Sequence, residues 1–126
     1  MTLEFLPAGS PDCPLIRLYA FTPDEAATLH AELPALANGG LDRVEVHGLA
    51  GVEPVGGCRL TLVAEARDLG IAREDLAGAS WCGSISDTWG EVAGRVEPFV
   101  KETSGYQWLA GPPGDVSLLL SADGRW

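Results

Sequence analysis

At 126 residues, 46 % of them hydrophobic and 21 % charged, the chain is expected to fold as one domain with its own core, and long disordered tracts are excluded. The net charge of −10 disfavours phosphate backbones and anionic lipid, so we expect no nucleic-acid and no membrane partner. The N-terminus has neither a basic nor an apolar signal region, and no apolar run approaches the roughly 20 residues that span a bilayer, which predicts a cytoplasmic location.

The first predicted elements are an arm, a strand and a helix. Residues 1–14 are rich in proline and form the arm, in which Leu3–Leu6 is predicted to be a short strand. The apolar run Leu15–Phe21 predicts a second strand. Thr22–Ala37 is predicted to be a helix, because its first residues match a capping box and its apolar stripe repeats at helical spacing, at Leu29, Leu33 and Leu36.

Two features are expected to end this helix. Pro34 lacks the amide hydrogen that a helix interior needs, which predicts a kink or an end near Leu33. The sequence Asn38-Gly39-Gly40 then supplies a C-terminal stop.

Strands are predicted next at Val44–Gly48 and Cys58–Ala66. The second run alternates apolar and polar residues, which is typical of a strand with one face on a core. The polar segment Arg67–Gly78 is interpreted as a surface connector, with a single helical turn at Arg73–Leu76.

The same order recurs after the connector. A strand is predicted at Ser80–Ser86, a helix at Thr88–Lys101, and two strands at Tyr106–Leu109 and Val116–Ser121. The helix again opens with a capping box, since Thr88 is followed three residues later by a glutamate.

The chain is therefore predicted to be an α+β protein in which a β-α-β-β unit, residues 15–66, is joined by residues 67–78 to a second unit, residues 79–126. We expect one mainly antiparallel sheet of about six strands with two helices on one face. The seam between tandem units is a natural place for a ligand or a partner.

In element order, over residues 15–121, the chain resembles the gyrase-inhibitor-like, effector-binding domains of bacterial transcription regulators. The resemblance implies a cleft between the repeats that holds a small ligand beside an acidic residue, a part that Glu45 or Glu65 would play. Ferredoxin-like variants, dimeric barrels and other α+β sandwiches fit the same order.

The apolar faces of both helices and both alternating strands predict one continuous core. Its members are expected to include Leu29, Leu33, Leu60, Leu62, Val96, Phe99, Leu118 and Leu120.

Strand alternation also predicts which side chains lie on the sheet face without helices. Valines and leucines are assigned to the core, and the polar residues between them are assigned to the opposite face. Arg17 joins this face if its neighbours Ile16 and Leu18 face the helices. Aromatic residues two positions apart near the chain's end add a pair that suits a planar ligand. The predicted binding surface consists of Glu45, His47, Arg59, Thr61, Tyr106 and Trp108.

The sequence contains no motif that specifies a reaction. His47 beside Glu45 or Glu65, or His47 with Cys82, would supply an acid–base or a nucleophile pair, but neither lies in a catalytic motif. The spacing predicts reduced thiols without a disulfide or a zinc site for the three cysteines, Cys13, Cys58 and Cys82. No cofactor, metal or catalytic residue is predicted.

We therefore expect a non-catalytic binding or interaction module for a small molecule or a protein partner. A small enzyme that uses His47 with a carboxylate is one alternative. An acidic protein that binds a basic partner or imitates nucleic acid is another. The sequence leaves open the ligand, the partner and whether the chain forms a homodimer.

Overall fold

The computed structural model describes residues 1–64, 69–74, 80–85, 89–111 and 114–126. Sheet A, as we call the five-stranded sheet, consists of β1 (Thr2–Leu6), β2 (Leu15–Tyr19), β4 (Glu53–Pro54), β8 (Tyr106–Ala110) and β9 (Ser117–Ser121). Sheet B, the four-stranded sheet, consists of β3 (Arg43–Glu45), β5 (Arg59–Ala64), β6 (Gly70–Arg73) and β7 (Ser80–Ile85). The helices are α1 (Pro23–Asn38), α2 (Trp89–Val96), α3 (Pro98–Lys101) and the 3-10 turn η1 (Val46–Gly48).

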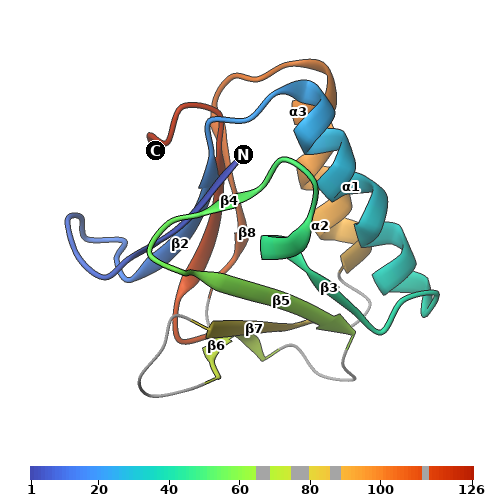
Figure 1. Cartoon of the computed structure of the whole chain (residues 1–126), viewed down its shortest axis with the longest axis horizontal. Coiled ribbons are helices and arrows are strands. Elements are labelled where there is room, and N and C mark those ends of the chain that lie inside the picture. The colour runs from blue at the N-terminus through green and yellow to red at the C-terminus, as the bar shows by residue number, and fades with distance from the viewer. Residues whose placement is uncertain (65–68, 75–79, 86–88, 112–113) are drawn as a thin grey trace.

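The α+β class is confirmed, but the prediction of one six-stranded sheet is wrong. The strand order is β4-β1-β2-β9-β8 in sheet A and β3-β5-β7-β6 in sheet B. The helices pack beside one another on one side of the molecule, and sheet B lies below sheet A (Figure 1). Within the described residues, no helix is long and apolar enough to cross a membrane.

The two sheets arise because the halves of the chain exchange strands. β2 lies parallel to β9, and β7 lies parallel to β5, so the first strand of each half pairs with the last strand of the other. Antiparallel partners then flank these central pairs: β1 beside β2, β8 beside β9, β6 beside β7 and β3 beside β5. Alternation along a strand indicates which face is buried, but not which strand lies next to it.

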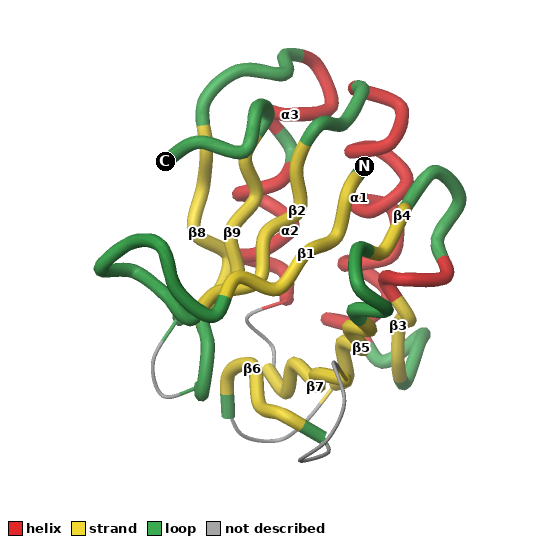
Figure 2. Tube along the Cα trace, turned by 60° about the vertical axis from the view of Figure 1, so that its left-hand side comes forward, coloured by secondary structure: helices red, strands yellow, loops and turns green. Residues whose placement is uncertain are grey.

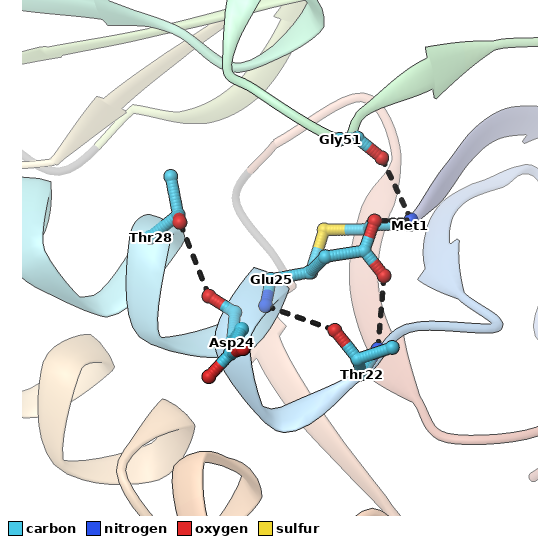
Figure 3. Close-up of polar contacts among 6 residues, drawn as sticks. All are labelled: Met1, Thr22, Asp24, Glu25, Thr28 and Gly51. Atoms are coloured by element: carbon cyan, nitrogen blue, oxygen red, sulfur yellow. Dashed lines mark hydrogen bonds and ion pairs between the residues drawn. The ribbon is translucent and has the colours of Figure 1, made fainter.

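The start of α1 is held by the predicted capping box (Figure 3). The Thr22 hydroxyl accepts a hydrogen bond from the Glu25 amide at 3.2 Å, and the Glu25 carboxylate accepts one from the Thr22 amide at 2.9 Å. The other carboxylate oxygen of Glu25 accepts a hydrogen bond from the Met1 ammonium at 2.5 Å, and this ammonium also donates to the Gly51 carbonyl at 2.8 Å. One carboxylate therefore joins α1 to β1. Thr88, predicted to cap the second helix, lies outside the described residues.

Both helices differ from prediction at a proline. α1 continues through Pro34 to Asn38, so of the two predicted outcomes, a kink or an end near Leu33, the end is wrong. The predicted stop is confirmed, because Gly39 is the C-cap. Its apolar stripe is buried on both sides of the proline, and this packing offsets the lost backbone hydrogen bond. The helix predicted at 88–101 is divided, because Pro98 is the first residue of α3, where its fixed φ is well suited.

One core connects the helices with both sheets. It contains all eight of the predicted members, which confirms that part of the prediction. Trp89 at the start of α2 is also fully buried, and its indole N–H donates to the Val63 carbonyl of β5 at 2.9 Å. The two sheets therefore share one hydrophobic core.

Several short segments of the structure differ from the elements predicted from the sequence. The predicted strand 44–48 is divided into β3 and η1. β4 and β6 were not predicted, and Arg73, expected in a helical turn, is the last residue of β6. These segments have two to four residues, too few for a periodic pattern, and their conformation depends on the neighbouring strands.

Candidate functional site

The two sheets meet where β6 approaches the segment that precedes β9. The Ile71 carbonyl accepts hydrogen bonds from the amides of Asp115 at 2.7 Å and Val116 at 3.3 Å. Gly70 has φ +69°, and a Cβ at this position would lie 2.5 Å from the Gly114 nitrogen. Two backbones can approach this closely only because neither residue has a side chain. Figure 2 shows β6 and β7 below the lower ends of β1 and β9.

Beside this junction lies a pocket of about 450 Å³, which we call the seam pocket. Residues of both sheets line it: Phe5 from β1, Pro14 before β2, Arg73 and Glu74 at the end of β6, Trp81 from β7, and Asp115 and Val116 before β9. Its volume falls in the range typical of small-molecule sites. The pocket thus lies at the seam between the halves of the chain.

An aromatic pair and a cation form one wall of the seam pocket. The rings of Phe5 and Trp81 lie 4.8 Å apart between centroids, with their planes tilted by 40°. The Arg73 guanidinium lies over Trp81, 4.7 Å from the ring centroid, and 5.8 Å from that of Phe5. Stacking on aromatic faces fixes a guanidinium while leaving its N–H groups available at the edges. Arg73 makes no ion pair with another described residue.

Phe5 and Arg73 hold corresponding positions on β1 and β6, the strands that precede the two halves. Phe5 pairs with Ile16 in the β1–β2 ladder, and Arg73 pairs with Trp81 in the β6–β7 ladder. Ile16 in turn pairs with Leu118 of β9, and Trp81 pairs in the same way with Leu60 of β5. Equivalent positions of these two strands therefore meet in this pocket.

Polar groups are few in the seam pocket and lie near Arg73. The Asp115 carboxylate accepts a hydrogen bond from the Arg73 amide at 3.2 Å, and Glu74 is the next residue along the chain. The indole N–H of Trp81 is buried and makes no hydrogen bond with another described residue, an arrangement that costs about 1–3 kcal/mol. The pocket thus combines an apolar lining with one guanidinium and two carboxylates.

The residues that the sequence assigned to one binding surface are divided between the two sheets. Glu45 and Arg59 are exposed on sheet B, and Thr61 is buried there at 5 % exposure instead of facing outward. His47 lies in η1, and its Nδ1 is 3.2 Å from both the amide nitrogen and the carbonyl oxygen of Leu60. Their expected role in ligand binding stays a prediction.

The aromatic members of that surface lie on sheet A. Tyr106 is half exposed and borders a hollow of about 210 Å³ that Arg125 and Trp126 also line. Trp108 lines a separate hollow of about 300 Å³ together with Arg95 and Ser117. The described pockets do not bring these two residues together with the other four predicted residues, of which three lie on sheet B and His47 lies in η1.

The helix-free face of sheet A is partly occupied by the chain itself. Arg17 lies on this face, because Ile16 and Leu18 are in the core. Its guanidinium binds the Glu4 carboxylate at 2.6 and 2.9 Å, donates to the Gly124 carbonyl at 2.9 Å and lies 4.0 Å from the Tyr19 ring centroid. The Trp126 indole donates to Asp12 at 2.9 Å, joining the C-terminal segment to the arm.

The candidate chemical groups of the sequence include one deeply buried thiol. Burial, with a smaller contribution from the Glu4 carboxylate, raises the pKa of the Cys58 thiol to about 11, so it stays protonated at neutral pH. No cluster of three or more His, Cys, Asp or Glu residues suited to a metal ion occurs in the part of the chain that the structure describes. Glu65, considered as a partner of His47, lies outside the described residues.

The main residues of the seam pocket were missed by sequence reasoning. Phe5 was placed in an arm and Arg73 in a connector, because each belongs to a short flanking strand. Trp81 lies in the predicted strand Ser80–Ser86, but it was not among the predicted site residues. The sequence did predict that a ligand would bind at the seam between the two units. Only the pairing of the strands shows which residues line that seam.

Comparison of the chain with protein-family models, with curated proteins and with solved structures found no match.

Proposed function

We propose that this protein is a non-catalytic binding module whose seam pocket takes a small organic molecule. The observation that carries the proposal is the stacked group of Phe5, Arg73 and Trp81 beside a cavity of about 450 Å³. In an apolar cavity with a few fixed polar groups, burial of the ligand's apolar surface supplies the affinity, and the charged groups at the edge orient the ligand.

Rigidity of the site supports this proposal. Phe5 projects from β1, which pairs with β2, and Trp81 projects from β7, which pairs with β6. The close contact between Gly70 and Gly114 fixes the distance between sheets A and B. A wall whose side chains are held by strands loses little conformational freedom when a ligand enters, which favours binding.

The enzyme alternative has less support. Both the amide and the carbonyl of Leu60 lie within hydrogen-bonding distance of His47 Nδ1, so this nitrogen is engaged by backbone. The carboxylate of Glu45 lies 3.9 Å from the guanidinium of Arg43, and both side chains are mostly exposed. Catalysis by His47 would therefore have to use its other ring nitrogen, Nε2, and the Glu45 carboxylate predicted as its partner pairs with Arg43.

The proposal is tested by titrating the full chain with two uncharged aromatic fragments, phenol and indole, while amide chemical shifts are recorded by NMR. We expect saturable shifts at Phe5, Arg73 and Trp81. Phe5→Ala should weaken binding about tenfold, equivalent to 1.4 kcal/mol, by removing one aromatic wall. Tyr106→Ala, which changes an exposed ring on sheet A, is the matched control.

Two results would contradict the seam pocket as the site. Shifts centred on Tyr106 and Trp108 would place binding on the helix-free face of sheet A, where the sequence predicted it. Absence of saturable shifts with either fragment would overturn the proposal as a whole.

A further inference from the structure

We infer that the ligand of the seam pocket is a small apolar zwitterion, of which a free apolar α-amino acid is the simplest example; this inference rests on the proposed function. Its starting point is the pairing of one guanidinium with two carboxylates at the edge of an otherwise apolar cavity. A zwitterion presents one carboxylate and one ammonium next to an uncharged body.

The guanidinium of Arg73 is suited to the ligand's carboxylate. It is stacked over Trp81 and makes no ion pair with the described residues, so its N–H fork is available. An arginine held in this way binds a carboxylate with two parallel hydrogen bonds.

The carboxylate of Asp115 is suited to the ligand's ammonium. The hydrogen bond from the Arg73 amide to Asp115 Oδ2, at 3.2 Å, holds this acid next to the residue that carries the guanidinium. Asp115 Oδ1 accepts no hydrogen bond from a described residue and so can accept one from a ligand. Glu74 adds a second negative charge on the same side of the pocket.

Ligands with a single charge fit this arrangement less well. A monoanion would meet Arg73 but also two carboxylates, in a protein of net charge −10. A monocation would meet the guanidinium that already lies over both aromatic rings. A zwitterion has no net charge, so the overall field of the protein does not repel it, and each of its charges faces an opposite one.

The apolar part of the ligand is expected to lie against Phe5, Pro14 and Val116. These side chains supply much of the apolar lining of the pocket, and the partly exposed ring of Phe5 offers a surface for an apolar or aromatic side chain. A cavity of about 450 Å³ holds a single amino acid with room to spare.

The test compares three probes of one shape by calorimetric titration of the full chain. L-phenylalanine carries both charges, 3-phenylpropionate lacks the ammonium, and 2-phenylethylamine lacks the carboxylate. We expect L-phenylalanine to bind at least about tenfold more tightly than either analogue, the ratio that a charged hydrogen-bonded pair supplies.

Variants assign each charge to its partner. Arg73→Gln should reduce the affinity for L-phenylalanine to that for 2-phenylethylamine, and Asp115→Asn should reduce it to that for 3-phenylpropionate. Arg73→Lys keeps the charge without the planar fork and should retain part of the affinity. Arg43→Gln, on exposed β3, is the matched control and should change nothing.

The possible failures are distinguishable. If phenol still shifts the amides of Phe5 and Trp81 but the three charged probes bind equally, or if Arg73→Gln and Asp115→Asn leave the affinity for L-phenylalanine unchanged, the zwitterion is refuted and the binding module stands. If neither phenol nor indole gives saturable shifts, the proposed function fails as well.

Discussion

Glu25 shows how one residue can join distant parts of this chain. Its two oxygens accept hydrogen bonds from the Met1 ammonium and from the Thr22 amide. These contacts, the ammonium first, lower the pKa of the carboxyl below its ordinary value of 4.5, and burial opposes them only partly. Because the folded pKa is the lower one, the stabilisation is complete above the ordinary value and is lost as the pH falls through the folded pKa.

Glu25→Gln tests this linkage. The amide can still accept from Thr22 but cannot attract the ammonium, so we expect a loss of roughly 1 kcal/mol at pH 7. The variant should also lose less stability than the wild type as the pH falls below 4.5. Urea unfolding at a series of pH values measures both effects. Glu32→Gln, on the same helix, should follow the wild-type curve, and an identical curve for Glu25→Gln would contradict the assignment.

Gly70 tests the contact between the sheets at the same scale. Alanine there would adopt φ +69° and place its Cβ 2.5 Å from a backbone nitrogen, so the junction must open. We expect Gly70→Ala to lower the free energy of unfolding by more than about 1 kcal/mol. Gly94→Ala, in α2 with no atom within 4 Å of the added methyl group, should instead raise it by about 0.5–1 kcal/mol. Equal effects of the two substitutions would contradict a close contact at the seam.

At the scale of elements, local signals were sufficient for α1 and for the alternating strands. The capping box of Thr22 and the buried faces of Leu60 and Leu118 depend on residues near one another in sequence, and all were predicted. Strand partners were not, since β2 lies against β9 from the other end of the chain. Thr61 is polar yet buried, so alternation alone misplaced it. β6 is too short to show a periodic pattern, so the pocket that contains Arg73 could not be derived from the sequence.

Pro34 offers a test of how packing overrides local preference in α1. Pro34 is exposed within the helix, so Pro34→Ala restores a backbone donor without disturbing the core. We expect a gain of about 1–2 kcal/mol, less than the full cost of an interior proline because proline also restricts the unfolded chain. Pro98→Ala, at the first position of α3, should give no gain. Denaturant midpoints that fail to separate the two variants would show that α1 is already distorted to suit its proline.

At the scale of the whole molecule, the exchange of strands makes the two sheets depend on each other. Neither half of the chain can complete a sheet alone, because β2 needs β9 and β5 needs β7. The core cluster likewise contains residues of both sheets and of all three helices. A ligand in the seam pocket would touch both sheets and so stabilise the whole fold in proportion to its occupancy.

Leu60 and Leu118 test this dependence, since they occupy matching places on β5 and β9 and are 0 % and 1 % exposed. Each Leu→Ala substitution should cost about 2–5 kcal/mol through lost burial and a residual cavity. Because both residues belong to one core, each substitution should lower the melting temperature of the whole structure. Tryptophan fluorescence and far-ultraviolet circular dichroism should then report a single, coincident transition. Val55→Ala, 43 % exposed, should leave that transition in place. Two separate transitions, with Leu60→Ala moving one and Leu118→Ala the other, would mean that the sheets fold independently and that the seam is a boundary between them.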